Sequence, residues 1–250
     1  MTRISDYQAP DNCLADRTIL ITGAGGSIGA AVAKAAAQHG ATVILLGKTI
    51  AKLETVYDEI KQAGSPEAII MPLDLLGATQ QDYRTMTDAI DKEFGKLDGL
   101  IHNAALLGAR MQFEQYDLEL WQKVMQVNLT APMLLTQSCL PLLKKSNDAS
   151  IIFTSSEVGR KGLAYWGGYA ISKAGNENMM QILADELETN TSIRVNSVDP
   201  GPVRSAMRLA AFPGEDQDSL VSADEIVGGY LYLLGSDSKG ITGKQFSSQE

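Results

Sequence analysis

Short apolar runs alternate along the chain with longer segments in which apolar residues recur every three or four positions. The first pattern is typical of buried strands and the second of amphipathic helices. We therefore expect strands at residues 17–22, 42–46, 68–73, 97–102, 150–155 and 192–198. Helices are expected at residues 27–40, 51–64, 79–95, 117–144, 168–190 and 224–234.

Strands that alternate with helices of this length predict βαβ crossovers and a parallel sheet. The expected strands are almost wholly apolar, which indicates that helices cover both faces of the sheet. No linker, repeat or low-complexity segment interrupts the pattern. We predict one doubly wound α/β domain over residues 1–250. Within it, the loop at 206–220 has helical character in its first half and is predicted to be a lid over the substrate.

Charge and hydropathy narrow the classes of function. The chain holds 30 acidic and 21 basic residues and a net charge of −9, whereas a protein that binds phosphate backbones needs a basic face. The first 17 residues lack the apolar core of a secretion signal, and no apolar run is long enough to span a bilayer. We expect a cytoplasmic protein that binds neither nucleic acid nor membranes.

Metal and disulfide chemistry is not expected. Cys13 and Cys139 lie far apart in the chain, and His39 and His102 are the only histidines. These spacings match neither a disulfide framework nor a zinc site, so we predict no metal centre.

A glycine-rich turn, ITGAGGSIGA, joins the first expected strand to the first expected helix. Glycines in such a turn allow positive φ angles and let the backbone approach a pyrophosphate at the start of the helix. Tight turns use glycine for other reasons too, so the turn alone is weak evidence. Its place in the first βα unit favours dinucleotide binding.

The end of the second expected strand, LLGKT, distinguishes the two nicotinamide dinucleotides. An acid at this place normally binds the ribose 2′-hydroxyl of NAD, but here Lys48 stands there and no carboxylate occurs before Glu54. A lysine attracts a 2′-phosphate, so we expect NADP(H) to be favoured over NAD(H). The alternative is that Lys48 is only a solvated lysine at the start of a helix.

Several stretches, in this order and spacing, resemble the non-extended short-chain dehydrogenases/reductases across nearly the whole chain. Within that family the chain is most similar to bacterial oxidoreductases of the YciK type. The closing GITGKQF looks like the family's last strand region, and the resemblance implies a seven-stranded parallel sheet of order 3-2-1-4-5-6-7. The matching stretches are TGAGGSIG (22–29), Asp74 with Leu75, HNAA (102–105), VN (127–128), SS (155–156), YAISK (169–173), RVN (194–196) and PGPVRS (200–205).

The resemblance assigns the catalytic residues by position. Ser156 precedes Tyr169 by thirteen residues, as the family pattern requires, whereas Ser155 is one residue off. Lys173 and Asn128 complete the implied catalytic set. The implied cofactor-binding residues are Gly23, Gly25, Ser27, Ile28, Gly29, Lys48, Asp74, Leu75, Asn103, Ala104, Tyr169, Lys173, Pro200, Gly201, Val203 and Ser205.

Two positions depart from the family pattern, and neither belongs to the catalytic set. Ser27 stands where the family has a glycine, which puts the shape of the phosphate turn in doubt. HNAA replaces the usual NNAG, and packing at the end of a strand explains His102 better than catalysis does. Members of the family are commonly dimers or tetramers, so we expect a homo-oligomer.

The stretch YAISK places Tyr169 and Lys173 on one helix face, because residues four apart lie above one another. A nearby ammonium favours the tyrosinate, so we expect Lys173, with the oxidised cofactor, to lower the pKa of Tyr169 toward working pH. Tyr169 would then be the acid and base, with Ser156 donating to the developing oxyanion. The resemblance implies that Lys173 also holds the nicotinamide ribose and that Asn128 holds a relay water.

The expected reaction is NADP(H)-dependent interconversion of a carbonyl and an alcohol, on a small molecule that the sequence does not identify. Two alternatives stay open: a cofactor-sensing protein without turnover, and an epimerase or dehydratase of the extended branch. Apolar lining with a few polar groups is typical of a substrate pocket, although these residues could instead pack a loop or a subunit contact. The candidates are Leu107, Glu157, Trp166 and Met207, with Arg160, Tyr165, Arg208 and Phe212 near them.

Overall fold

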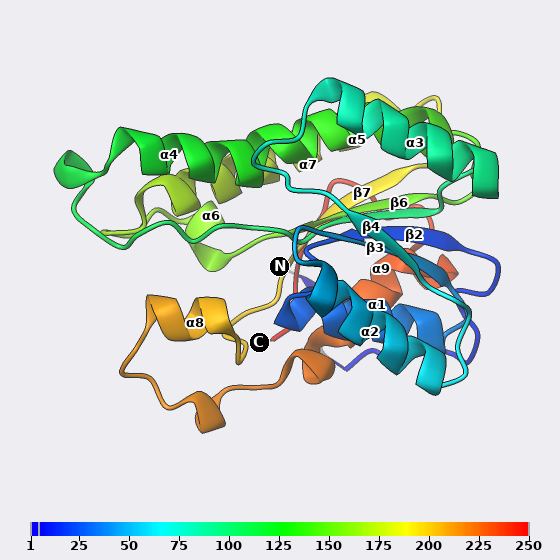
Figure 1. The fold of residues 1–250 in the computed structure, drawn as a ribbon, viewed down its shortest axis with the longest axis horizontal. Helices are drawn as coiled ribbons and strands as arrows, with labels where there is room; N and C mark the ends of the chain where they lie inside the picture. Colours follow the sequence, from blue (N-terminus) through cyan, green and yellow to red (C-terminus); the bar gives the residue numbers. More distant parts are fainter. Residues whose placement is uncertain (1, 5, 250) are drawn as a thin grey trace.

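One parallel sheet runs through the centre of the computed structural model, which describes residues 2–4 and 6–249 (Figure 1). Its strand order is β1-β8-β7-β6-β5-β2-β3-β4, and all neighbours pair in parallel. The strands are β1 (Thr2–Arg3), β2 (Thr18–Thr22), β3 (Thr42–Gly47), β4 (Ile69–Pro72), β5 (Gly99–His102), β6 (Ser150–Thr154), β7 (Arg194–Asp199) and β8 (Gln245–Ser247).

The seven strands expected from the sequence occupy the predicted order, so that prediction is confirmed. The eighth strand, β1, is an addition at the sheet edge, where Thr2 pairs with Phe246 and Arg3 with Ser247. A strand of two residues is too short to display a period of two, which is why the hydrophobic pattern did not reveal it.

Helices cover both faces of the sheet, as the apolar strands predicted (Figure 1). One face carries α1 (Ser27–Gln38), α2 (Ile50–Gln62) and α9 (Val227–Leu234). The other carries α3 (Gln80–Phe94), α4 (Leu118–Met125), α5 (Ala131–Leu143) and α7 (Gly167–Glu188). The short helices are α6 (Glu157–Arg160), α8 (Ala206–Ala211), η1 (Phe113–Gln115), η3 (Gln217–Ser219), η4 (Ala223–Ile226) and η5 (Ser236–Ser238).

Each strand from β2 to β7 contributes to two apolar cores, because its side chains alternate between the two faces. In β2, Ile19 and Ile21 pack among residues of α1 and α9, whereas Leu20 packs with residues of α3 and α5. All three side chains are fully buried. This two-sided burial makes the sheet a rigid platform for the residues at its carboxyl edge.

The helix expected at 117–144 contains a π-helical turn, η2 (Gln126–Thr130), between α4 and α5. Pro132 explains the irregularity, because it lacks the N–H that would bond to the carbonyl of Asn128 in a regular helix. That carbonyl accepts instead from Nδ2 of Asn176 on α7, at 2.9 Å. Single π turns occur often at functional sites, and this one carries a predicted catalytic residue.

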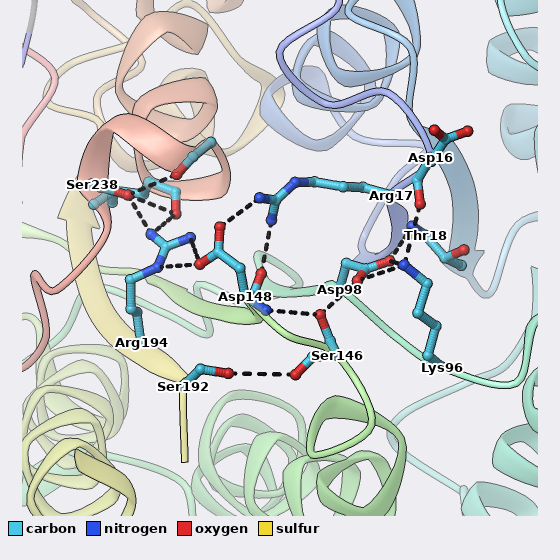
Figure 2. Close-up of polar contacts among 12 residues, drawn as sticks. Asp16, Arg17, Thr18, Lys96, Asp98, Ser146, Asp148, Ser192, Arg194 and Ser238 are labelled. Carbon is cyan, nitrogen blue, oxygen red and sulfur yellow. Dashed lines mark hydrogen bonds and ion pairs between the residues drawn. The ribbon is translucent and has the colours of Figure 1, made fainter. Parts of the chain in front are cut away.

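A charged cluster joins the starts of several strands at the amino edge of the sheet (Figure 2). Asp148 binds Arg17 at 2.5 Å and Arg194 at 3.1 Å, and these arginines lower the pKa of its carboxyl. Asp98 accepts from the backbone N–H of Thr18 at 2.9 Å and from Ser146 Oγ at 2.6 Å. We call Arg17, Asp98, Asp148 and Arg194 the amino-edge network.

Candidate active site

A cavity of about 410 Å³ lies at the carboxyl edge of the sheet, where open α/β sheets bind their ligands. It runs from the glycine-rich turn after β2 to the start of α7. Gly29, Gly201 and Val203 are outside its lining, and the other predicted cofactor-binding residues all line it. These are Gly23, Gly25, Ser27, Ile28, Lys48, Asp74, Leu75, Asn103, Ala104, Tyr169, Lys173, Pro200 and Ser205.

The turn after β2 is closed so tightly that two of its glycines admit no side chain. Gly23 has φ +67°, and a Cβ there would lie 2.9 Å from Cα of Ala104. A Cβ on Gly29 would lie 2.3 Å from the carbonyl oxygen of Gly23. Helix α1 begins at Ser27 with no acid in its first turn, so its amino end can face an anion. Ser27 therefore leaves the turn intact, and the cradle fits a pyrophosphate.

The far end of the cavity carries two exposed lysines, Lys48 after β3 and Lys52 in the first turns of α2. Lys52 was not among the predicted residues, although its spacing of four from Lys48 could have indicated a shared surface. With glycine at 47 and no acid at the end of β3, this end of the cavity fits a phosphorylated ribose.

Residues after β5 are locked to the glycine turn by hydrogen bonds. Thr22 Oγ1 accepts from the backbone N–H groups of Asn103 and Ala104, both at 3.0 Å. Next to them His102 is buried, stacked on Phe153, with Nε2 2.8 Å from Thr136 Oγ1. Burial lowers the pKa of His102 to about 3, so the ring stays neutral and acts as a packing residue, as predicted.

The predicted catalytic side chains meet at the inner end of the cavity. Ser156 lies two residues beyond the end of β6, just outside the lining of the cavity, and its hydroxyl is hydrogen-bonded to Tyr169 at the start of α7. Lys173 is fully buried and donates from Nζ to the carbonyl of Thr154 at 2.7 Å. Its Nζ lies 5.7 Å from the centre of the Tyr169 ring. The helix spacing therefore does place Tyr169 and Lys173 on one face.

The ionisation of this pair differs from the sequence-based expectation. Burial, and then the Asp199 carboxylate, raise the pKa of Tyr169 to about 12, opposed by the hydrogen bond from Ser156. Burial lowers the pKa of Lys173 to about 8, opposed by Asp199 and Glu177. The expected lowering of the Tyr169 pKa by Lys173 was thus wrong for the protein chain by itself, because desolvation and the Asp199 carboxylate raise this pKa.

Asn128 connects the loop after β5 to helix α7. Its Nδ2 donates to the carbonyl of Leu106 at 2.9 Å and to Ser172 Oγ at 3.0 Å. Its Oδ1 accepts from the N–H of Leu106 at 2.7 Å. These bonds give the side chain a positioning role that the resemblance did not imply, while its contact with a water stays a prediction.

Apolar side chains surround the exposed side of Tyr169. Three of the four predicted substrate residues, Leu107, Trp166 and Met207, pack against Tyr169 and its buried neighbours. The Trp166 and Tyr169 ring centres are 5.8 Å apart. Glu157, the fourth, is exposed directly after Ser156. Of these four residues Met207 lines the cavity, whereas Leu107, Glu157 and Trp166 lie outside its lining. The apolar surroundings suit an apolar ligand.

The two arginines near this end lie differently from expectation. Arg160, a candidate near the substrate, instead bonds Glu177 beneath the site at 3.0 Å. Arg110 was missed: its guanidinium lies over the neighbouring rings of Trp166 and Phe212, at 4.8 and 4.5 Å from their centres. It also donates to the carbonyl of Ala211 at 2.5 Å. No local sequence pattern predicts this cluster of Arg110, Trp166 and Phe212, because the three residues come from separate segments of the chain.

The segment 206–220 is helical in its first part, as predicted, because it begins with α8. Ser205 caps this helix by accepting from the N–H of Arg208 at 3.1 Å, and Met207 lines the cavity. Arg208 binds Glu215 at 2.6 Å and so braces the segment. Movement of this segment as a lid stays a prediction.

The fold and the cavity together define an oxidoreductase that binds a nicotinamide cofactor at the carboxyl edge of a doubly wound sheet. The model of the short chain dehydrogenase family matches residues 17–216, and the chain belongs to this family.

Its relatives place it within the family. The chain is 44% identical to the oxidoreductase YciK of Escherichia coli over 97% of this chain and 96% of YciK. A short chain dehydrogenase structure from Pseudomonas syringae superposes with a TM-score of 0.96 at 50% identity, covering 98% of this chain and 99% of that one. A structure from Shigella flexneri in complex with NADP has a TM-score of 0.94 at 44% identity and covers 96% and 100%.

Two further findings bear on the earlier expectations. Among residues 2–4 and 6–249, no group of three or more histidine, cysteine, aspartate or glutamate side chains is arranged to hold a metal ion. Within the same residues, every helix is too short or too polar to cross a bilayer.

Proposed function

We propose that the protein is an NADP(H)-dependent oxidoreductase that interconverts a carbonyl and an alcohol, with Tyr169 as acid and base. The observation that carries this proposal is that Tyr169 and Lys173 lie side by side in the lining of the dinucleotide cavity while Ser156 is hydrogen-bonded to Tyr169. A proton donor, an oxyanion donor and a buried cation thus share one small volume next to the cofactor cradle.

In the reductive direction, NADPH supplies the hydride when it is bound. Ser156 donates its hydroxyl hydrogen to the carbonyl oxygen, on which negative charge develops. Tyr169 then gives its proton to that oxygen, and its high pKa in the chain keeps it protonated beforehand. Lys173 provides the positive charge that stabilises the resulting tyrosinate. In the oxidative direction the same residues run the sequence backwards.

The preference for NADP(H) rests on the two lysines at the far end of the cavity. Lys48 and Lys52 would face a 2′-phosphate, and the end of β3 offers no carboxylate to bind a free 2′-hydroxyl. The Shigella flexneri relative in complex with NADP supports the same assignment. Asp74, Leu75 and Asn103 would surround the adenosine, and Pro200 and Ser205 the nicotinamide.

The test begins with cofactor binding. NADPH and NADH are titrated against the protein while the fluorescence of its two tryptophans, Trp121 and Trp166, is followed. Tighter binding of NADPH is expected. An aliphatic ketone, a cyclic ketone and a β-ketoacyl thioester are then screened for NADPH oxidation, with Tyr169→Phe as the control. Binding without turnover of any carbonyl compound would favour a cofactor-sensing protein, and tighter binding of NADH would refute the NADP(H) assignment.

We also propose that the protein is a cytoplasmic homodimer or homotetramer. Exposed apolar side chains on α4, α5 and α7 support this, since they would be covered by a second copy. They are Leu118, Met133, Ile171 and Ile182. Light scattering at micromolar concentration should give a multiple of the monomer mass, and a monomer mass would contradict the proposal.

A further inference from the structure

Glu177 lies one turn beyond Lys173 on α7 and is buried beneath the catalytic residues. Its carboxylate accepts hydrogen bonds from four side chains on four different elements. The donors are Ser155 at the end of β6, Ser197 of β7 at 2.8 Å, Gln245 of β8 at 2.8 Å and Arg160 of α6 at 3.0 Å. Glu177 therefore ties the helix of Tyr169 and Lys173 to the strand end that carries Ser156.

Arg160 extends the cluster to a second carboxylate. Its guanidinium donates to the carbonyl of Phe246 at 3.0 Å, and its Nη1 lies 4.0 Å from Oδ2 of Asp199. Asp199 ends β7 and accepts from the N–H of Gly201 at 2.9 Å. It thus anchors the start of the segment that is predicted to face the nicotinamide.

The four charges of this cluster, buried or nearly so, balance. Lys173 and Arg160 are positive, while Glu177 and Asp199 are negative. A buried ammonium is unfavourable unless opposite charges lie near it. The hydrogen bond of Lys173 goes to a neutral carbonyl, so its electrostatic support has to come from charges further away. Both Glu177 and Asp199 act in this direction.

We propose that Glu177, Arg160 and Asp199 are positioning residues of this active site, which align Ser156 with Tyr169 and Lys173, and that the two carboxylates hold Lys173 in its charged form. We call these three residues with Lys173 the carboxyl-edge network. This proposal rests on the proposed function, because the site is an active site only if the protein is an enzyme. Its central test, however, does not measure turnover.

Other titratable groups around Lys173 do not supply this support. His102 of β5 stays neutral. Tyr169 of α7 and Tyr230 of α9 have pKa values raised by burial, so both are uncharged near neutral pH. Glu157 of α6 is exposed to solvent, which screens its charge. The charge state of Lys173 therefore depends on Glu177 and Asp199.

The test is competitive labelling of the whole protein with acetic anhydride across a pH series, read at the Lys173 peptide by mass spectrometry. Only the uncharged amine reacts, and Lys173, although almost wholly buried, is among the residues that line the cavity, through which a small reagent would enter. In the wild type, half-maximal reactivity is expected near pH 8, the pKa to which burial lowers Lys173. In Glu177→Gln and in Asp199→Asn it should move to lower pH by about half a unit or more.

Asp199→Asn keeps the test decisive if Glu177→Gln does not fold, because an asparagine oxygen can still accept from Gly201. The matched control is Asp148→Asn, which removes a carboxylate that likewise faces arginines, at the opposite edge of the sheet. It should leave the Lys173 titration in place. An unmoved titration in the folded Asp199→Asn protein, or an equal shift in Asp148→Asn, would overturn the proposal. Failure to find a carbonyl substrate would leave these results unaffected and count only against the proposed function.

Discussion

Two charged networks stand at opposite edges of the same sheet. The amino-edge network joins Asp148 to Arg17 and Arg194 (Figure 2), and the carboxyl-edge network joins Arg160 to Glu177 and Asp199. Both hold the ends of neighbouring strands together through arginine–carboxylate contacts. Only the carboxyl-edge network lies beside the cavity. The comparison teaches that position on a parallel sheet, and not the chemistry of the pair, determines whether a buried ion network acts in catalysis or in stability.

The reason lies in the direction of the strands. All of them run the same way, so every loop that follows a strand opens at the carboxyl edge, together with the amino ends of the helices. Ser156 follows β6 there, and Pro200 follows β7. At the amino edge, strands begin after helices have ended, and Asp98 and Asp148 bond to strand starts. A charge there has structural neighbours only.

The largest effect should come from the carboxyl edge itself. In Tyr169→Phe, NADPH binding should persist while carbonyl reduction falls by about 10²- to 10⁴-fold, because the proton donor is lost. The rate of NADPH oxidation with the substrate found in the screen, compared between the variant and the wild type, measures this loss. Lys173 donates to the backbone carbonyl of Thr154 and not to Tyr169. Loss of the Tyr169 hydroxyl therefore leaves this hydrogen bond in place, and the variant should retain its fold. Activity near the wild-type level in this variant would contradict the role of Tyr169 as acid and base.

The next largest effect should separate the two networks directly. Asp148→Asn should lower the free energy of unfolding by about 2 to 3 kcal/mol, since it leaves two arginines poorly paired. Its kcat at a temperature where it is folded should equal that of the wild type. Glu177→Gln should lower stability as well, but also lower kcat about tenfold or more through misalignment of Ser156 and Tyr169. Urea unfolding gives the free energy of unfolding, and steady-state kinetics give kcat. Equal losses of kcat in the two variants would contradict the proposed difference between the two networks.

Lowering the pH should destabilise the folded protein through His102, which ends β5 at the carboxyl edge of the sheet. Burial lowers the pKa of His102 to about 3 in the folded protein, against an unfolded value of about 6.5. Its contribution to stability is therefore complete above pH 6.5 and is lost as the pH falls below that value, by up to about 1.4 kcal/mol per pH unit.

The histidine content of the chain allows a clean control for this prediction. His102→Gln should flatten the dependence of the unfolding free energy between pH 6.5 and 5 relative to the wild type, as about one proton fewer is taken up on unfolding. His39→Gln removes the only other histidine, which bonds the carbonyl of Ala35 at 2.9 Å. It should leave the slope contributed by His102 in place. Identical slopes in His102→Gln and the wild type would contradict the assignment.

The smallest expected effect concerns the far end of the cavity. Lys48→Ala should reduce the preference for NADPH over NADH by about tenfold, because one exposed charge next to a phosphate is partly screened. Lys61→Ala near the end of α2, the helix that follows Lys48, lies outside the cavity lining and is the matched control. Dissociation constants from fluorescence titration test this. If the ratio of the NADH and NADPH dissociation constants is unchanged in Lys48→Ala, Lys48 does not contact the 2′-phosphate. Lys52 would then be the remaining candidate for that contact.

Local patterns carried much of the fold and part of the site. The alternation of strands and helices, the glycine turn and the shared face of Tyr169 and Lys173 each depend on neighbours a few residues away, so a single stretch of sequence is enough to indicate them. The strand order was expected only from the family resemblance, because it depends on pairing between distant segments. The spacing of four from Lys173 to Glu177 was visible in the same way, but nothing local distinguishes it from a solvated helix face. Its burial depends on β7 and β8, which are distant in the chain.

The sequence by itself determined the alternation of strands and helices, the phosphate turn and the set of groups available for proton transfer, because these follow from periodicity and side-chain chemistry. Only the tertiary structure decided how those groups ionise and which of them work together. Burial raised the pKa of Tyr169 where a neighbouring lysine alone would have lowered it, and Arg160, expected near the substrate, is held by its ion pair with Glu177. Desolvation and long-range pairing depend on everything packed around a group, and that environment exists only in the folded chain.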